Sequence, residues 1–364
     1  MTTPPLTKPD IRRPGAVDAA WLTAVLQHAG VDAVVGAFEA KNVGTGQIGE
    51  SVRFKLTYER DAEDAPRSLV GKFPSPDDTS RGTGIMLGNY LREVRFYQQL
   101  APRALVQTPR CWFTDTDVTG GEFVLMMEDL APAEQGDQLK GVTLDQAKLV
   151  VEQAARLHGS FWGDEGLDDL PWVQGSKAAP ASAVTPELVS GLWQGFRARY
   201  AQRLKPHWIE VGEALTGGWN RFGEREQGPR TLAHHDFRPD NMMFGTPAGG
   251  HPVTVLDWQS FTYAVGATDV AYFLAGALPR DVRRAHEAEL LALYHAELTR
   301  LGVTGYSIGD LRRDYGVGAF QLFLTAFFAS MVVVQTARGD DMFMQMLGSA
   351  ADHILDHDAL AALA

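Results

Sequence analysis

His234-His235-Asp236-Phe237-Arg238-Pro239-Asp240-Asn241 is the most informative segment of this chain, and the next apolar run contains Val255-Leu256-Asp257-Trp258-Gln259. A phosphoryl group in transfer carries charge on its equatorial oxygens, so the reaction needs a metal ion that neutralises this charge and a group that orients the attacking hydroxyl. The segment supplies an Asp, then an Asn, then a second Asp in the order that this chemistry uses. We therefore predict Asp236 as the catalytic residue and Asn241 and Asp257 as metal ligands. Asp and Asn also gather in ordinary turns, which is the alternative.

A glycine-rich segment precedes these residues. Gly44, Gly46 and Gly49 follow a G-x-G-x-x-G pattern between two strand-like segments, 34–42 and 52–59. The second segment alternates apolar and polar residues with period two, which argues against the helix that a dinucleotide-binding fold places after its last glycine. A loop between two strands is the context in which kinases cover nucleotide phosphates. A plain hairpin turn also explains three glycines.

Lys72 and Glu93 are the next candidates along the chain. Lys72 lies near the end of an apolar strand, 68–73, where a buried lysine needs an anion such as a phosphate. Glu93 lies beside the apolar stripe of a helix expected over about 86–100, so it could reach Lys72. Each residue has an ordinary alternative, because a lysine at a strand edge can extend to solvent and charged residues fill most exposed helix faces.

The order of these features favours the functional interpretation. Glycine loop, strand lysine, helix glutamate, apolar strand, H-x-D-x-x-x-x-N and strand-borne Asp follow one another as they do in kinases. The chain resembles the aminoglycoside-phosphotransferase and choline-kinase-like superfamily of small-molecule kinases, and within it the ecdysteroid-kinase-like branch. The segments that carry the resemblance are 44–51, 93–97, 128–130, 157–162, 234–241 and 256–259.

The resemblance implies an α+β, bilobal, protein-kinase-like fold. Its N-lobe, expected over 1–127, would contain a small antiparallel sheet, the glycine loop and one packed helix. Its C-lobe, expected over 128–364, would be mainly helical and hold the hinge, the catalytic loop and the acceptor site. The resemblance also implies ATP and Mg²⁺ as cofactors and a small-molecule hydroxyl acceptor as the partner.

Further roles follow from the same resemblance. Backbone groups of a hinge within 123–130 would read the adenine edge, and the residues assigned to this task are Met126, Met127 and Glu128. An apolar strand that enters a turn explains this segment equally well. His234 and Asp269 would support the catalytic loop, with His234 or Arg238 as the expected partner of Asp269. Asp269 can also be an ordinary residue in the first turn of a helix.

The acceptor is less well defined by the sequence. Too few residues separate Gln259 from 266–272 to form a long activation segment, so a protein substrate is not expected. An apolar hydroxylated metabolite, sterol-like or hydroxyacyl, is preferred because the intervening helices are rich in tryptophan. Those tryptophans can equally be core residues; they are Trp162, Trp172, Trp193 and Trp208. The alternatives are an aminoglycoside or other antibiotic phosphotransferase and a nucleotide-binding pseudokinase. The stretch 175–185 can be a mobile lid or a linker.

Composition sets outer limits. A chain of 364 residues with 45% apolar content can bury two sizeable cores. The single cysteine, Cys111, excludes an internal disulfide framework, no Cys/His zinc cluster is evident, and a cytoplasmic location is the default expectation. The N-terminus shows no signal-peptide pattern. A net charge of −12 argues against nucleic acid. The apolar stretch 317–334 contains Gln321, Thr325 and Ser330, so we expect a buried helix and no membrane attachment. No obligatory protein partner is inferred.

Overall fold

The computed structural model describes residues 8–44, 48–117, 119–180, 184–222 and 228–363. The chain divides into two compact units, each described here by itself. The first comprises Met1–Arg103, Thr108–Ala131 and Leu256–Ser260, and the second comprises Ala104–Gln107, Pro132–Val255 and Phe261–Ala364. The chain passes from the first unit to the second after Ala131, close to the lobe boundary expected between residues 127 and 128. The short return of Leu256–Ser260 assigns Asp257 to the first unit.

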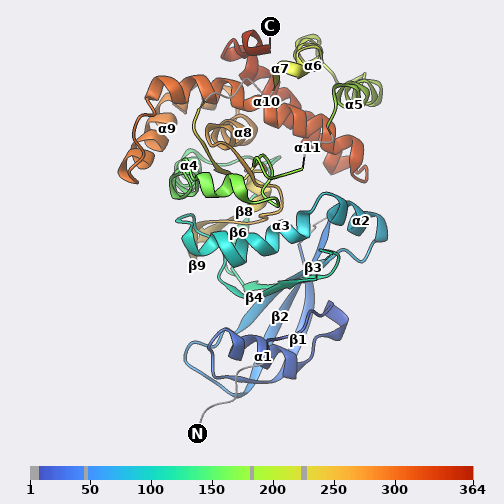
Figure 1. The fold of residues 1–364 in the computed structure, drawn as a ribbon, viewed down its shortest axis with the longest axis vertical. Helices are drawn as coiled ribbons and strands as arrows, with labels where there is room; N and C mark the ends of the chain where they lie inside the picture. Colours follow the sequence, from blue (N-terminus) through green and yellow to red (C-terminus); the bar gives the residue numbers. More distant parts are fainter. Residues whose placement is uncertain (1–7, 45–47, 118, 181–183, 223–227, 364) are drawn as a thin grey trace. The chain divides into compact units, whose positions relative to one another are not determined.

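The first unit is built on an antiparallel sheet with the strand order β1-β2-β3-β5-β4. In β2, Val52, Phe54 and Leu56 are buried and alternate with more exposed residues, as the period-two pattern predicted. The helix α1, Ala19–His28, lies against this sheet (Figure 1) and begins at Asp18, whose carboxylate accepts the backbone N–H of Trp21. The strand bounds are Val34–Val43 (β1), Gly49–Arg60 (β2), Ser68–Pro74 (β3), Cys111–Thr116 (β4) and Phe123–Glu128 (β5).

The helix expected over about 86–100 is divided in the structure. An additional helix, α2, occupies Asp78–Met86, and α3 begins only at Asn89 and ends at Arg95. Gly88 separates them with a φ of +67°, a left-handed conformation that glycine adopts without strain and that ends a helix. After α3 the chain continues as one π-helical stretch, Phe96–Leu100. Of the apolar stripe expected at positions 91, 94, 97 and 100, Val94, Tyr97 and Leu100 are buried, and Leu91 is half-buried.

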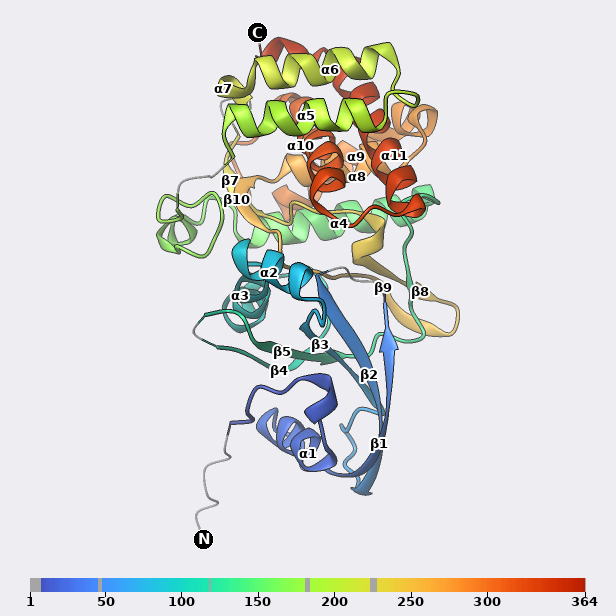
Figure 2. The same cartoon turned by 90° about the vertical axis from the view of Figure 1, so that its right-hand side faces the viewer.

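The second unit is mainly helical. Its centre is α8, Ala267–Ala277, in which every residue is buried, and α10 and α11 pack against it. Figure 2 shows α5 and α6 side by side. Further helices complete this unit. The bounds are Leu144–Ser160 (α4), Pro186–Arg199 (α5), Pro206–Gly217 (α6), Trp219–Phe222 (α7), Arg280–Arg300 (α9), Ile308–Val332 (α10) and Ala337–Asp356 (α11).

Two small antiparallel sheets frame the segment 234–241. Strand β7, Arg230–Ala233, runs into it and pairs with β10, Thr262–Val265. Strand β8, Met242–Thr246, leaves it and lies between β6, Glu134–Gln135, and β9, Gly249–Val255. The candidate catalytic segment is therefore fixed by a strand at each end. Together the two units form the predicted α+β, protein-kinase-like fold, with an antiparallel sheet in one unit and helices dominating the other.

The apolar stretch noted in the sequence forms α10. Among the described residues, this one helix has the length and composition to cross a membrane, with 25 residues and a mean hydropathy of 1.5 in its most apolar window. In the structure 61% of that window is buried inside the protein. The expected buried helix is thus what the fold contains at this position.

Candidate active site

In the first unit, Lys72 lies between two carboxylates. Its ammonium nitrogen Nζ is 2.9 Å from Glu93 Oε1 and 2.7 Å from Glu93 Oε2, and it is 2.9 Å from Asp257 Oδ1. Lys72 comes from β3, Glu93 from α3 and Asp257 from the returning segment Leu256–Ser260. The contact expected between Lys72 and Glu93 is present, and the structure adds Asp257 to it.

The electrostatic balance of this group is uneven. Two carboxylates share one ammonium, so the group carries an excess negative charge. Burial opposes the charge on Lys72, but Asp257 and Glu93 outweigh this effect and raise the pKa of the lysine. Burial raises the pKa of Glu93, and the negative charge of Asp257 adds to that rise while Lys72 opposes it. A cation that approached Asp257 would complete the charge balance.

Three contacts fix the orientation of the Asp257 segment. The amide nitrogen Nε2 of Gln259 donates to Asp257 Oδ2 over 3.1 Å, and Arg92 donates to the backbone carbonyl of Gln259. The ring of Trp258 stacks on Phe96 with a centroid separation of 3.9 Å and an interplanar angle of 4°. The sequence suggested Gln259 only as a family marker. Its contact with Asp257 gives that position a physical role, and nothing in the sequence pointed to Arg92.

The glycine loop is only partly described, because Gly46 lies outside the described residues. Gly44 follows β1 with a φ of +78°, which favours glycine. Gly49 opens β2, and a Cβ atom added there would lie 3.1 Å from the carbonyl oxygen of Phe73 and 3.4 Å from Cε of Lys72. The hydroxyl of Tyr90 donates to the backbone carbonyl of Ile48. A side chain at position 49 would therefore crowd the strand that carries Lys72.

The expected hinge residues lie at the end of β5. Met126 is opposite Gly71 of β3 and Phe113 of β4, and Met127 is likewise paired on both sides. In an inner strand, the backbone N–H and C=O groups are hydrogen-bonded to the two neighbouring strands. Glu128, the last residue of β5, still donates its backbone N–H to the carbonyl of Arg110 over 2.8 Å. The backbone groups of Met126 and Met127 are thus engaged within the sheet, and their role in reading the adenine edge stays a prediction.

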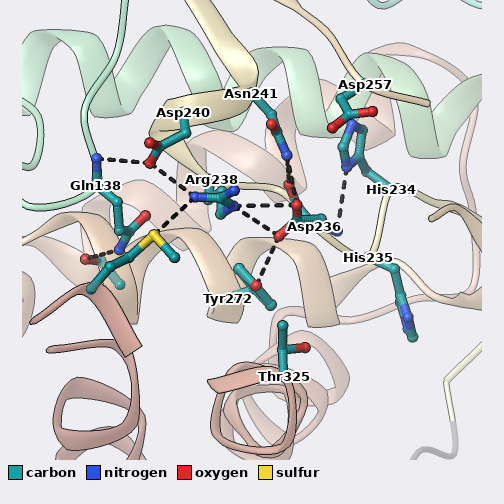
Figure 3. A network of polar contacts seen from close by, with 12 residues as sticks. Gln138, His234, His235, Asp236, Arg238, Asp240, Asn241, Asp257, Tyr272 and Thr325 are labelled. Carbon is teal, nitrogen blue, oxygen red and sulfur yellow. Dashed lines mark hydrogen bonds and ion pairs between the residues drawn. The ribbon is translucent and has the colours of Figure 1, made fainter. Parts of the chain in front are cut away.

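In the second unit, Asp236 is held by three side chains (Figure 3). The guanidinium Nε of Arg238 lies 3.1 and 3.2 Å from its two carboxylate oxygens, the Tyr272 hydroxyl donates to Oδ1 over 2.9 Å, and the Asn241 amide nitrogen donates to Oδ2 over 2.8 Å. Asp236 and Asn241 are thus in direct contact. The amide oxygen of Asn241 is left on the side away from Asp236 (Figure 3). Sequence reasoning missed Tyr272, which carries no motif of its own.

Asp269 anchors the start of the segment 234–241, but through other partners than expected. Its carboxylate accepts the backbone N–H groups of His234 and His235 over 2.6 and 2.9 Å, and it lies 3.1 Å from Nε2 of His158. The expected side-chain partners were His234 or Arg238. A Cβ atom at Gly266 would come within 2.7 Å of the His158 ring, so the glycine permits this approach. The helix α8 begins at Ala267, which leaves Asp269 in its first turn.

Comparison with known proteins gives a family. The family model described as "Phosphotransferase enzyme family" matches residues 49–304, well over half of the chain. This chain belongs to the phosphotransferase enzyme family. The expected enzyme class is confirmed: the protein is a small-molecule phosphotransferase with a hydroxyl group as the acceptor. No curated protein sequence matches the chain closely enough to refine this assignment.

Solved structures agree on the fold of this phosphotransferase. A protein from Ralstonia eutropha, provisionally described as an aminoglycoside phosphotransferase, is similar with a TM-score of 0.52, 15% identity, and coverage of 94% of this chain and 97% of that one. A Plasmodium vivax ethanolamine kinase is similar with a TM-score of 0.51 and 12% identity, and the match covers 94% of this chain and 89% of that one. A microcompartment-associated aminopropanol kinase is similar with a TM-score of 0.51 and 14% identity, and the match covers 94% of this chain and 99% of that one. At these identities the likeness concerns the fold alone. The ecdysteroid-kinase-like branch stays a prediction.

The tryptophans considered for the acceptor site of this phosphotransferase divide into two kinds. Trp193 is fully buried and packs against Phe196, Phe323 and Phe327, so it is a core residue. The other three are only partly buried. The possible lid over 175–185 lies partly outside the described residues, at 181–183, and the described part is tied down where the backbone N–H of Lys177 donates to Asp168. Its role as a lid stays a prediction.

A further polar group of the phosphotransferase lies between α9, α10 and α11. The carboxylate of Glu287 and the rings of His353 and His357 each offer an atom that could bind a metal ion, and these atoms lie within 4.8 Å of one another. Glu287 already accepts from the buried Arg283 over 2.6 Å and from the Tyr315 hydroxyl over 3.2 Å. Burial lowers the pKa of His353 to about 3, so its ring is neutral. The arginine compensates the carboxylate, and the group is explained as a buried ion pair that joins three helices.

Proposed function

We propose that this protein is an ATP- and Mg²⁺-dependent kinase that phosphorylates the hydroxyl group of a small, apolar metabolite. The observation that carries the proposal is the group formed by Lys72, Glu93 and Asp257. In kinases, nucleotide phosphates and their metal are bound by a lysine that is paired with a helix glutamate and lies near an aspartate after an apolar strand. The partly buried Lys72, with Glu93 and Asp257, has this arrangement. Membership of the phosphotransferase family supports this reading.

The residues present fit magnesium. Mg²⁺ prefers hard oxygen ligands and is bound in such enzymes by one or two carboxylates together with substrate phosphates. Asp257 offers a carboxylate within a group that carries excess negative charge, and Asn241 has its amide oxygen turned away from Asp236. When bound, the metal would neutralise charge on the phosphates.

The proposed reaction is a direct transfer. The acceptor oxygen forms a bond to the γ-phosphorus of ATP while the bond to the β,γ-bridging oxygen breaks, and ADP leaves. The acceptor proton passes to Asp236, and from there to solvent. Lys72, held by Glu93, would hold the α- and β-phosphates, and the backbone near Gly44 and Gly49 would cover them.

The preference for an apolar acceptor rests on the charges around the catalytic loop. An acceptor with several ammonium groups needs carboxylates that are free to pair with it. Asp240 instead lies 3.0 Å from Arg238 and 2.9 Å from Arg338, and Asp137 lies 3.2 Å from Arg338. Both carboxylates are thus engaged in ion pairs with Arg238 and Arg338 and are not free to meet an ammonium group. The arrangement favours a neutral hydroxylated compound, sterol-like or hydroxyacyl, over an aminoglycoside.

The test is a screen of hydroxylated metabolites for acceptor-dependent ADP release, with the Asp257→Asn variant as an inactive control. A sterol-like or hydroxyacyl compound that is phosphorylated in a magnesium-dependent manner supports the proposal. Phosphorylation of aminoglycosides, with resistance of expressing cells, would replace it by an antibiotic phosphotransferase. Nucleotide binding without transfer to any acceptor would indicate a pseudokinase.

A further inference from the structure

One short helix of the first unit, α3, contacts three separate parts of the proposed nucleotide site. Its residues Tyr90, Arg92 and Glu93 are all buried. Glu93 pairs with Lys72 of β3, as described above. The other two side chains reach the glycine-rich segment and the returning segment Leu256–Ser260. The helix is therefore connected to the proposed site by more than its glutamate.

Arg92 connects α3 to the segment that follows Asp257. Its guanidinium Nη1 donates to the backbone carbonyl of Gln259, and its Nη2 donates to the backbone carbonyl of Leu87 over 2.8 Å. Nη1 also donates to the amide oxygen of Asn89 over 3.3 Å. Leu87 and Asn89 lie where α3 begins. One side chain thus joins the start of the helix to the returning segment.

The positive charge of Arg92 is not matched by an acid. The three acceptors of its hydrogen bonds are uncharged, and burial lowers the pKa of its guanidinium to about 10. Its Nε meets no acceptor among the described residues. A buried cation without a counter-charge costs stability, and an apolar side chain would fill the same space without that cost. Proteins retain such costs chiefly at functional sites, so the burial of Arg92 indicates a functional role.

Tyr90 connects the same helix to the glycine-rich segment. Its hydroxyl donates to the backbone carbonyl of Ile48, the residue before β2, and accepts the backbone N–H of Ser75, the residue after β3, over 3.4 Å. Its ring stacks on Phe123 of β5 with a centroid separation of 4.6 Å, which fixes the direction of the hydroxyl. Tyr90 therefore joins the start of β2 and the end of β3 to α3.

We propose that Arg92 and Tyr90 are positioning residues that make α3 the common support of the glycine-rich segment and of the segment Leu256–Ser260. Loss of either contact lets the helix shift, and the shift reaches the segment that the other contact holds. The consequence for magnesium-ATP binding rests on the proposed function. The link between the two segments is a property of the chain itself and can be measured without nucleotide.

The first experiment measures hydrogen–deuterium exchange of the full chain by peptide mass spectrometry, in the absence of nucleotide. Arg92→Met and Tyr90→Phe should each accelerate exchange at least about threefold in both 48–52 and 256–260, although Arg92 is bonded to the second segment and Tyr90 to the first. The matched control is Gln98→Ala, which removes one hydrogen bond to a backbone carbonyl just after α3 and away from the site. It should leave exchange in both segments unchanged.

Magnesium-ATP binding supplies the second readout. Arg92→Met should weaken binding about tenfold and Tyr90→Phe about threefold, because they lose a charged and a neutral hydrogen-bond donor. Both act through one helix, so the double variant should lose about tenfold, whereas independent effects would give about thirtyfold. Arg92→Lys keeps the charge and should lie between the wild type and Arg92→Met. A merely structural role would lower the thermal stability and leave the affinity of the folded protein unchanged.

The outcomes separate this inference from the proposed function. Faster exchange in neither segment, or only in the one that the altered side chain contacts, would overturn the inference, and so would additive losses of magnesium-ATP affinity. Should Arg92→Met not fold, Arg92→Lys and Tyr90→Phe serve in both measurements, since each retains most of its side chain. A wild type that binds no magnesium-ATP defeats the proposed function, and the exchange measurement then decides the inference alone.

Discussion

The two units treat their central carboxylates in opposite ways. In the first, Glu93 and Asp257 share the single ammonium of Lys72 and retain an excess of negative charge. In the second, Asp236 is matched by Arg238 and by two further hydrogen-bond donors. The first arrangement is short of one cation, whereas in the second both carboxylate oxygens of Asp236 already accept hydrogen bonds. A group that is short of a cation is suited to bind one, and a group that is satisfied is suited to hold a fixed direction.

This contrast predicts different kinetic failures for the two aspartates. Asp236→Asn should reduce turnover by at least about 1,000-fold while the KM for ATP stays within about twofold, because only the orientation of the acceptor is lost. Asp257→Asn should reduce turnover as much and also weaken magnesium-dependent ATP binding at least about tenfold. Steady-state kinetics and nucleotide titration with and without Mg²⁺ distinguish the two. Equal ATP affinities in both variants would contradict the proposal that Asp257, and not Asp236, contributes to nucleotide binding.

Removal of the lysine should expose the charge imbalance as a loss of stability. Lys72→Met leaves two neighbouring carboxylates without their cation, and breaking a buried pair in this way costs about 3 kcal/mol. The matched control is Lys72→Met combined with Glu93→Gln, which should regain part of that loss. Urea denaturation of the three proteins provides the measurement. If the single variant were as stable as the wild type, the group would not carry the excess negative charge described above.

Gln259 offers a gentler change in the first unit. Gln259→Ala removes the hydrogen bond to Asp257 without altering any charge, and such a bond contributes about 1 kcal/mol. We expect a rise of about fivefold in the KM for magnesium-ATP and little change in turnover at saturation. Gln259→Glu is the informative companion, because a third carboxylate should weaken ATP binding unless magnesium is raised. Wild-type kinetics in Gln259→Ala would count against an orienting role.

The smallest expected effect concerns the backbone of the second unit. His235 adopts a φ of +66°, a conformation that disfavours residues with a Cβ atom. His235→Gly should therefore be more stable than His235→Ala by about 1 kcal/mol, since both lack the histidine ring and differ only in that atom. Thermal or chemical denaturation of the pair measures this difference. Equal stabilities would mean that the two N–H bonds to Asp269 do not impose the conformation.

Much of the first unit could be predicted from the sequence because its signals are local. Alternation in 52–59 marked a strand, and the lysine in an apolar strand required an anion, which the structure supplies as Glu93 and Asp257. The break at Gly88 was missed because the helical periodicity continues across it. The hinge was placed at Met126 and Met127 by resemblance, whereas strand pairing on both sides depends on contacts far apart in the chain.

The second unit shows where sequence reasoning ends. Asp236, Asn241 and Asp269 belong to short motifs, so they could be named in advance. Tyr272 and His158 could not, because their roles depend on how α8 and α4 bring them to the loop. The partner of Asp269 was expected among nearby residues of the loop, and the structure uses a histidine from a distant helix together with two backbone groups. Residue type alone did not indicate these contacts.

The return of Leu256–Ser260 to the first unit has a consequence for any attempt to dissect the protein. A fragment that stopped at Ala131 would lack Trp258 and leave the face of Phe96 bare, and it would also lack Asp257. Its lysine would then face one acid where the whole protein has two. The proposed nucleotide site is encoded on both sides of the segment 234–241. Truncation, gene fusion or recombination between relatives must therefore keep the pentapeptide 256–260 together with the sheet.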